Sequence, residues 1–435
     1  INHARNYLDA WVSTAEHRGW FYDDSKTLQW GLKIQHEDIW DRLNEWEYVD
    51  SAGYSVPQTP PAFWGTSPID SLRPIPVSPR DEISLRTAIK AENRVQSNRV
   101  MGYFQWENAF DLDTSQFNLN LGARFNYWDF NNQFLLSPRA NLSFKPNWNK
   151  DFVFRASWGY YHQPAFYREM RDLNGNVNQN IKAQTSIHYV LGSDYNFKAW
   201  GRPFKFVSEI YYKQLKNLIP YEIDNVRLRY YAENNASGYA KGIDLKINGE
   251  FVKGVESWAS ISVMQTKEDV ANDFYTEYYN SDGDLIINGF TQNNVVTDSA
   301  AVPRPTDQRV TFGLFFQDYL PRIPSVKMNL NILFGTGLPF GPPSYERYKD
   351  TLRIPPYRRV DIGGSYQILK PERERKPGRA LNSLESLSLG IEVFNLLQVN
   401  NTISYLWIRD VTNRQYAIPN YLTNRQVNIK LIARF

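Results

Sequence analysis

The stretch Asn424-Arg-Gln-Val-Asn-Ile-Lys-Leu-Ile-Ala-Arg-Phe435 decides the fold of this chain. Its apolar positions alternate with mostly polar ones, as Val427, Ile429, Leu431, Ala433 and Phe435 against Gln426, Asn428, Lys430, Ile432 and Arg434. A period-2 strand that ends on an aromatic residue suits a transmembrane barrel with lipid outside and water inside. The first hypothesis is therefore an all-β fold, a transmembrane antiparallel β-barrel.

Composition is consistent with this hypothesis. The chain has 435 residues and no run of 18 apolar residues, so a spanning helix is ruled out and a closed barrel is the remaining way to cross a bilayer. A mean hydropathy of -0.54 does not argue against a barrel, because only every second residue meets lipid. Aromatic residues make up 15% of the chain, and such rings favour the boundary between lipid and water.

Charge and cysteine content exclude several classes of function. The net charge is +3 and no basic stripe is present, so nucleic acid is not a predicted partner. The chain has no cysteine, which excludes disulfides and thiolate metal sites. It begins at Ile1 without the features of a signal peptide, and we expect a truncated or processed sequence.

Similar alternation recurs along the whole chain, for example in residues 117–127, 152–161, 243–251, 310–316, 326–334 and 360–368. It predicts fifteen strands near 3–20, 26–50, 90–111, 115–129, 132–147, 151–165, 182–197, 203–222, 236–253, 255–270, 307–320, 325–337, 357–370, 384–398 and 422–435.

The connections between these strands alternate between two kinds. One kind is mostly short, and the other is mostly long, near 51–89, 166–181, 223–235, 271–306, 338–356 and 399–421. Outer-membrane barrels have short periplasmic turns and long extracellular loops, so the pattern predicts a periplasmic C-terminus. The pairs Asn174-Gly175 and Asp282-Gly283 predict hairpin turns inside two of the long loops.

An odd number of strands cannot close a bacterial barrel whose two ends lie in the periplasm. Either the count is wrong by one, or strands upstream of Ile1 complete the wall.

Several segments together resemble the C-terminal two-thirds of the barrel of a TonB-dependent outer-membrane receptor. They are Leu136-Ser-Pro-Arg-Ala-Asn-Leu-Ser-Phe-Lys-Pro146, Phe154-Arg-Ala-Ser-Trp-Gly-Tyr-Tyr-His-Gln-Pro164, His188-Tyr-Val-Leu-Gly-Ser-Asp-Tyr195, Glu209-Ile-Tyr-Tyr-Lys213, Gly238-Tyr-Ala-Lys-Gly-Ile-Asp-Leu245, Tyr357-Arg-Arg-Val-Asp-Ile-Gly363, Val393-Phe-Asn-Leu-Leu397 and Arg434-Phe435.

The resemblance implies a barrel of 22 strands, of which residues 1–435 would supply about fifteen. The plug domain and the first strands would then be absent from this sequence, as would the N-terminal segment that engages TonB. The implied partners are the chain's own N-terminal plug domain, the TonB energy-transducing complex and outer-membrane lipid. A surface lipoprotein or another subunit is a further candidate partner.

Candidate ligand contacts are mostly aromatic residues of the expected extracellular loops: Trp64, Tyr161, His162, Tyr167, Arg168, Tyr275, Tyr278, Tyr279, Tyr345 and Trp407. Aromatic loop tips also pack one loop on another, and that reading stays open for each of them. The charged residues expected to face the lumen are Arg155, Lys205, Glu209, Asp244, Lys246, Glu250, Asp361, Lys430 and Arg434.

No catalytic, cofactor or metal site is predicted. The five histidines are scattered, and no nucleophile elbow, phosphate loop or zinc-protease signature occurs. The expected function is active import of a scarce solute, such as a siderophore, cobalamin, a glycan or a peptide. The alternatives are a passive channel, a barrel subunit of a secretion or surface-lipoprotein assembly, and, last, a membrane enzyme.

Overall fold

The computed structural model describes residues 2–49, 84–279, 282–283, 293–297, 301–320, 323–342, 352–370, 384–409 and 415–435. Its main sheet has 17 strands, of which β1 (Asn2–Ala4) and β16 (Val302–Pro303) are only three and two residues long, which leaves fifteen long strands. Within these residues, no helix has the length and apolar character to cross a lipid bilayer.

The long strands pair in chain order, each antiparallel to the next. They are β2 (Tyr7–Asp23), β3 (Lys26–Val49), β4 (Ser84–Leu112), β5 (Ser115–Trp128), β6 (Gln133–Lys145), β7 (Asp151–Gln163), β8 (Gln184–Ala199), β9 (Arg202–Leu218), β12 (Ala236–Val252), β13 (Val255–Val270), β17 (Val310–Leu320), β18 (Ile323–Gly335), β21 (Tyr357–Leu369), β22 (Ser386–Phe394) and β25 (Gln426–Arg434). The predicted all-β antiparallel barrel wall of fifteen strands is confirmed. Strand ends differ from the prediction by several residues at most, and the largest extension is β4, which begins at Ser84 instead of residue 90.

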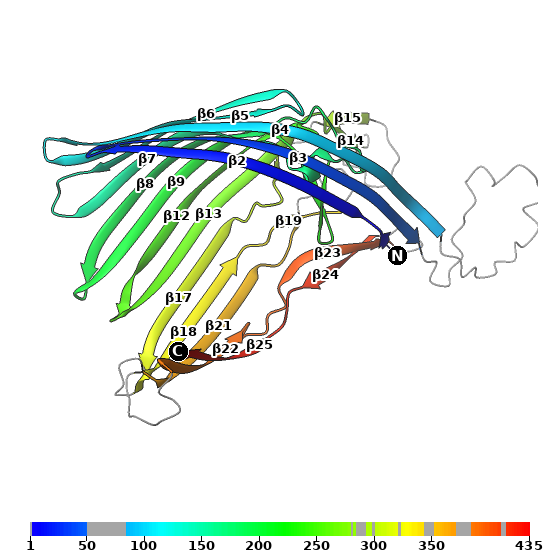
Figure 1. The fold of residues 1–435 in the computed structure, drawn as a ribbon. Helices are drawn as coiled ribbons and strands as arrows, with labels where there is room; N and C mark the ends of the chain where they lie inside the picture. Colours follow the sequence, from blue (N-terminus) through cyan, green and yellow to red (C-terminus); the bar gives the residue numbers. More distant parts are fainter. Residues whose placement is uncertain are drawn as a thin grey trace, which may run out of the picture.

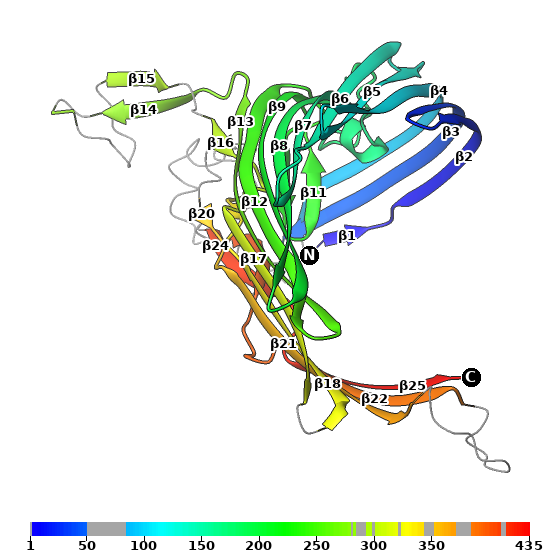
Figure 2. The same cartoon turned by 90° about the vertical axis from the view of Figure 1, so that its left-hand side faces the viewer.

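The sheet curves into a wall that is open along one side. Within the described residues, β2 pairs only with β3, and β25 pairs only with β22. Figures 1 and 2 show the resulting gap between β2 and β25. Both edge strands are exposed along almost their whole length, because no neighbour covers them.

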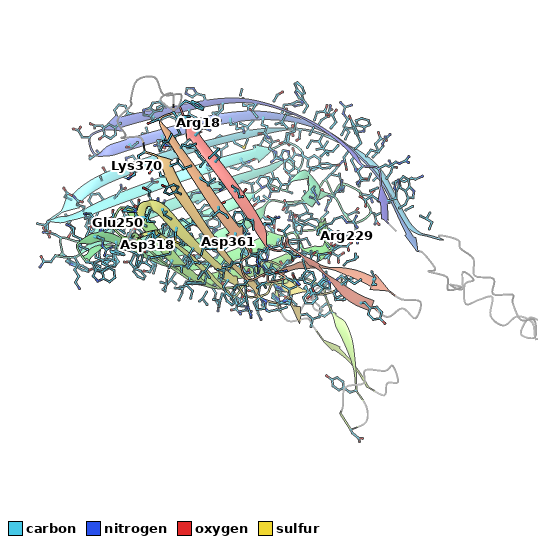
Figure 3. All side chains as sticks on the ribbon, turned by 90° about the horizontal axis from the view of Figure 1, so that it is seen from below. Arg18, Arg229, Glu250, Asp318, Asp361 and Lys370 are labelled. Carbon is cyan, nitrogen blue, oxygen red and sulfur yellow. The ribbon has the colours of Figure 1, made fainter. Side chains whose placement is uncertain are left out.

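The two ends of the wall differ, as the alternation of connections predicted. At the turn end, short connections such as Asp113-Thr114 and Lys253-Gly254 join the strands, and Asp113 and Gly254 take positive φ. At the loop end, the described parts of the long connections carry four hairpins: β10–β11 (Tyr221–Asp224, Arg227–Tyr230), β14–β15 (Tyr275–Tyr279, Asn293–Thr297), β19–β20 (Pro339–Phe340, Leu352–Arg353) and β23–β24 (Thr402–Arg409, Gln415–Tyr421). Figure 3 places Lys370, Glu250 and Asp318 toward the turn end and Arg229 toward the loop end.

Both predicted loop turns have a structural counterpart. Gly283 takes a φ of 86° in a turn between β14 and β15. Gly175 takes a φ of 92°, and Arg171 and Val177 form an isolated β-bridge around it.

The outer face of the wall is apolar and bordered by rings on both sides. Leu191, Ile210 and Ile391 have 64%, 57% and 51% of their surface exposed, as contact with lipid requires. Toward the turn end the rings of Phe117 and Phe144 stack with centroids 4.8 Å apart. Toward the loop end lie further outer-face aromatics: Trp158, Tyr160, Tyr189, Tyr212 and Tyr239. The membrane band therefore lies between the two groups of rings.

The inner face carries the charged residues. Strand register places eight of the nine predicted lumen-facing residues on the face away from the exposed aliphatic positions, and the ninth, Glu250, lies at the register break near the end of β12. Toward the turn end several cations are paired: Arg155 and Lys205 contact Asp194 at 2.7 and 2.9 Å, and Lys430 contacts Glu392 at 2.6 Å.

Candidate functional site

The loop end of the wall is built to hold folded loops. A strand of about 10 residues suffices to cross a bilayer, yet β3 has 24 residues and β4 has 29. Figure 1 shows both strands reaching well beyond the others at this end. The connection between β7 and β8, residues 164–183, folds against the inner face of β3 and β4. We call it the η3 loop, after its single turn of 3-10 helix, η3 (Tyr167–Met170).

Asp41 of β3 anchors the η3 loop. Its side chain is 3% exposed and accepts hydrogen bonds from Arg171 Nη1 at 2.7 Å and from Tyr167 Oη at 2.9 Å. Burial and the neighbouring Asp41 carboxylate raise the pKa of the Tyr167 hydroxyl, which therefore stays protonated as a donor. The loop is thus tied to a strand more than 120 residues earlier in the chain by a charged and a neutral hydrogen bond.

Gly175 brings the tip of the η3 loop against the wall. Its carbonyl accepts a hydrogen bond from Asn93 Nδ2 at 2.8 Å. A Cβ atom at this position would lie 2.7 Å from Ala91 Cβ and 2.9 Å from Leu43 Cδ1. Both the close approach and the φ of 92° require glycine.

Gly175→Ala is expected to loosen the η3 loop by about 1–2 kcal/mol, because it adds a steric contact to the cost of a positive φ. Amide hydrogen exchange of residues 166–181 measures the loss of protection. Gly201→Ala is the matched control, with exchange measured in its own turn between β8 and β9, since Gly201 has a φ of 72° and open space around its Cβ position. An equal effect at both glycines would show that contact with Leu43 and Ala91 contributes nothing.

An apolar cluster underlies the η3 loop. Its buried members are Trp128, Ala165, Met170, Ile181 and Ile219, which come from three separate segments of the chain: the end of β5, the η3 loop and the residue after β9. Tyr230 of β11 and Val177 pack against them. The loop is therefore held by a small core of its own, as a folded rather than a freely moving segment.

Glu169 lies buried within η3. It is 7% exposed, and its carboxylate accepts hydrogen bonds from the Phe166 backbone N–H at 2.9 Å and from Gln184 Nε2 at 3.2 Å. Among the described residues it forms no ion pair. Burial raises its pKa above the usual 4.5, although the two hydrogen bonds oppose the shift.

The raised pKa of Glu169 makes the η3 loop sensitive to pH. The folded loop holds the proton more tightly than the open loop, so its stability is greatest below pH 4.5 and falls as pH rises through the raised pKa. Glu169→Gln is expected to increase protection at pH 7 and to flatten this dependence. Hydrogen exchange, corrected for intrinsic rates at each pH, measures the effect. A loop equally protected in both proteins at pH 7 would contradict it.

A groove of about 330 Å³ lies between the η3 loop and the inner face of β2 and β3. Its floor is apolar, from Leu8, Ala10 and Ile39, and its other side is formed by η3 and Tyr230. Phe166 leaves 65% of its surface exposed here. Arg168 lies at the same groove and donates to the Leu228 carbonyl at 3.3 Å.

The β10–β11 hairpin continues from the η3 loop over the mouth. Arg227 approaches Glu45 of β3 at 3.8 Å, and Asn178 of the η3 loop donates to the Ala232 carbonyl at 2.8 Å. Glu222 is 6% exposed and lies 3.6 Å from Arg229. The hairpin is therefore joined both to the η3 loop and to the extended part of β3.

A second pocket lies where the β10–β11 hairpin meets β19 and β23. The ring of Phe340 stacks on Tyr405 with centroids 4.4 Å apart, and Trp407 lies 6.1 Å from Phe340. Glu222 lines the same pocket. Asn420 of β24 donates to Asn225 Oδ1, 195 residues earlier. The loops thus connect β3, near one edge of the open sheet, to the hairpin that precedes β25 at the other edge. We call this connected set, which consists of the η3 loop and the β10–β11, β19–β20 and β23–β24 hairpins, the mouth bridge.

Asp307 fixes the loops beside the second pocket. It is fully buried and accepts hydrogen bonds from Arg309 Nε at 2.8 Å, from the Thr266 backbone N–H at 2.7 Å and from Arg353. Arg353 also donates to the Gly337 carbonyl at 2.9 Å. This network holds β20 against the ends of β13 and β18.

The predicted ligand contacts fall into three groups. Tyr167 and Arg168 border the groove, and Trp407 lines the second pocket. Tyr161 and His162 lie on β7, and Tyr279 lies on β14. Tyr275 and Tyr278 lie on β14 with side chains that are not described, and Trp64 and Tyr345 lie outside the described residues.

Sequence reasoning missed Asp41, Glu169, Glu222 and Tyr230. One signal was available, because an expected strand of 25 residues, 26–50, is far longer than a bilayer requires. The polar residues in its second half, Asp41 among them, therefore had to meet water or another part of the protein.

The mouth bridge offers non-covalent contacts, from aromatic faces, an apolar floor and buried carboxylates. No group of three His, Asp or Glu side chains that could bind a metal occurs within the described ranges. The arrangement suits holding a solute.

A family model described as TonB dependent receptor-like, beta-barrel matches residues 2–396. No curated protein matches the chain.

Solved outer-membrane proteins share the fold. The outer membrane transporter YddB from Escherichia coli has a TM-score of 0.55 at 12% identity, over 99% of this chain and 54% of that one. The siderophore receptor PiuA from Acinetobacter baumannii has a TM-score of 0.54 at 12% identity, over 98% and 56%. For the copper transporter OprC the values are 0.54 and 12%, over 98% and 57%.

This chain spans a little over half the length of these three solved chains. At such low identity the likeness concerns the fold alone. The family match covers most of the chain, and the alternating faces and unequal ends of the wall agree with it. The chain belongs to the TonB-dependent receptor-like β-barrel family, a family of outer-membrane receptors and transporters rather than enzymes.

Proposed function

We propose that the chain forms the C-terminal part of the wall of an active importer that takes up a scarce solute across the outer membrane by a TonB-dependent mechanism. The observation that carries the proposal is the mouth bridge, which folds inward over the inner face and presents two aromatic-lined pockets there. The family match and the named functions of the structural neighbours support the same reading.

The proposal orients the wall. The loop end is extracellular, and the turn end, with the C-terminus, is periplasmic, because outer-membrane barrels keep their short turns on the periplasmic side. Seven further strands upstream would pair with the free edges of β2 and β25 and complete a 22-stranded barrel. A plug domain and a TonB-binding segment would precede them.

Uptake in living cells tests the proposal. Cells with and without the full-length receptor are grown in medium of known composition, and solutes that only the former deplete are identified by mass spectrometry. Depletion is expected to stop when an uncoupler dissipates the proton-motive force. Depletion that continues after uncoupling would instead indicate a passive channel, as would high conductance of the purified receptor in a planar bilayer.

The groove and the second pocket are the proposed solute contacts, through Tyr167, Arg168 and Trp407. Arg168→Ala and Trp407→Ala are the variants that test these contacts. Each should slow depletion of the identified solute, while Trp20→Ala, at the turn end of β2, should leave it unchanged.

A further inference from the structure

One row of residues on the inner face, just below the mouth bridge, collects positive charge. Register pairs Arg139 of β6 with Gly159, Gly159 with His188 of β8, and His188 with Lys213 of β9. Adjacent strands are ~4.8 Å apart, so Arg139 and Lys213 lie roughly 14 Å apart along the row. Arg124 of β5 is a diagonal neighbour of Arg139 on the same face. We call Arg124, Arg139, His188 and Lys213 the basic row.

The basic row faces the lumen at the level of the outer-face aromatic residues that lie toward the loop end. The residues next to it in sequence, Trp158, Tyr189 and Tyr212, have 39%, 48% and 45% of their surface exposed on the outer face. Because side chains alternate along a strand, Gly159, His188 and Lys213 point inward. A solute that passes the mouth bridge meets this row next.

The row has no acidic partner among the residues that the structure describes. None of its four members forms an ion pair, whereas Arg155 and Lys205, nearer the turn end, share Asp194. Glu209 and Asp244 are acids of the same face, and Glu209 lies four residues from Lys213 on β9. That is roughly 13 Å along the strand, beyond the Debye length of about 8 Å at physiological salt. Within the described residues, no neighbouring carboxylate therefore neutralises these cations.

Local packing prepares Arg139 for an anion. Its guanidinium lies 4.3 Å from the centroid of the Tyr161 ring, which stacks on His188 at 4.1 Å. Arg139 Nε is buried and has no hydrogen-bond partner within the described structure. A Cβ at Gly159 would lie 3.0 Å from Arg139 Cγ and 3.3 Å from Tyr161 Cε2, so glycine leaves room for the stack.

We propose that the basic row binds oxyanion groups of the imported solute, so that the substrate class is a solute with two or more carboxylate or phosphate groups. Arginine pairs with both groups in a bidentate geometry, and Lys213 supplies a second cation at a fixed distance. This inference rests on the proposed function, since it assigns a substrate class to that transport.

Calorimetric titration of the purified full-length receptor tests the inference, with citrate and pyrophosphate as the two oxyanion probes and glucose as the neutral one. Citrate or pyrophosphate is expected to bind, and the tighter of the two tells carboxylate from phosphate. Salt at about 0.5 M should weaken binding, because exposed charges are then screened. Glucose should not bind.

The decisive variant is Arg139→Gln with Lys213→Gln, which is expected to weaken binding about tenfold or more. The matched control is Arg155→Gln with Lys205→Gln, two lumen cations that already share Asp194, and its affinity should stay within about twofold of wild type. The mobility difference between boiled and unboiled samples on a gel confirms that each barrel is folded.

Three results would overturn the inference: unchanged affinity in the Arg139 and Lys213 variant, binding of glucose equal to that of the oxyanions, or no binding of either oxyanion. In the last case, a lower melting temperature of the variant would mean that the row pairs with the receptor's own plug. Binding requires no proton-motive force, so this test fails independently of the uptake test. Oxyanion binding without energised uptake would remove only the transport proposal.

Discussion

Asp41→Ala is expected to release the η3 loop from β3 and to lower the free energy of opening that loop by about 2–4 kcal/mol. The substitution removes the acceptor of two hydrogen bonds, from Arg171 and Tyr167, in a position that is 3% exposed. It also leaves the Arg171 cation without its partner. Because the Arg171 side chain is 22% exposed and can turn toward water, the cost stays below that of a fully buried orphan charge.

Hydrogen exchange of residues 166–181 measures this effect, and the same strand supplies the control. Asp38 of β3 also pairs with an arginine, at 2.7 Å from Arg94, but on the outer face and with both side chains partly exposed. Asp38→Ala is expected to leave the loop unchanged. Equal loss of protection in both variants would mean that removal of any charge from β3 loosens the loop.

A double variant separates the charge from the hydrogen bonds. Asp41→Leu with Arg171→Met replaces the pair by apolar side chains, which is often nearly neutral for a buried ion pair. Much of the lost protection should therefore return, although Tyr167 still lacks its acceptor. Solute uptake should follow the same order among the variants if the groove beside this loop contacts the solute.

The wall of this protein could be predicted from its sequence because each strand carries its own signal. The alternation in 151–165 predicts a strand, and β7 runs over Asp151–Gln163. Lipid on one side and water on the other impose this pattern residue by residue, so no knowledge of the partner strands is needed. The alternation of short and long connections follows from the same assignment of strands.

The site could not be predicted in this way, because its contacts join distant segments. Asp41 is separated from Tyr167 by 126 residues, and Asn225 from Asn420 by 195. The basic row depends on register, which fixes that His188 lies opposite Lys213 rather than one residue away. Sequence alone placed Arg155 and Lys205 in the lumen but gave no indication that they share Asp194.

Leu191→Arg is expected to lower the stability of the barrel by about 2–4 kcal/mol, the range for a cation that faces the middle of the bilayer. Leu191 is 64% exposed on the outer face, and β8 places it between Tyr189 on the loop side and Tyr195 on the turn side. Its neighbours across the strands are Ala156 and Ile210, which offer no counter-ion. Urea unfolding of the full-length receptor in phospholipid vesicles measures the loss.

Val207→Arg is the control that tests the assignment of the two faces. Val207 lies on β9 beside the membrane band, but it points inward, where register sets it opposite Asp194. An arginine there faces the aqueous lumen, beside Asp194 on one strand and Lys246 on the other, so its cost should be small compared with that at Leu191. If Val207→Arg were the more damaging change, the lipid-facing and lumen-facing surfaces would be exchanged. The basic row would then face hydrocarbon, where four cationic or polar side chains without acidic partners could not be accommodated.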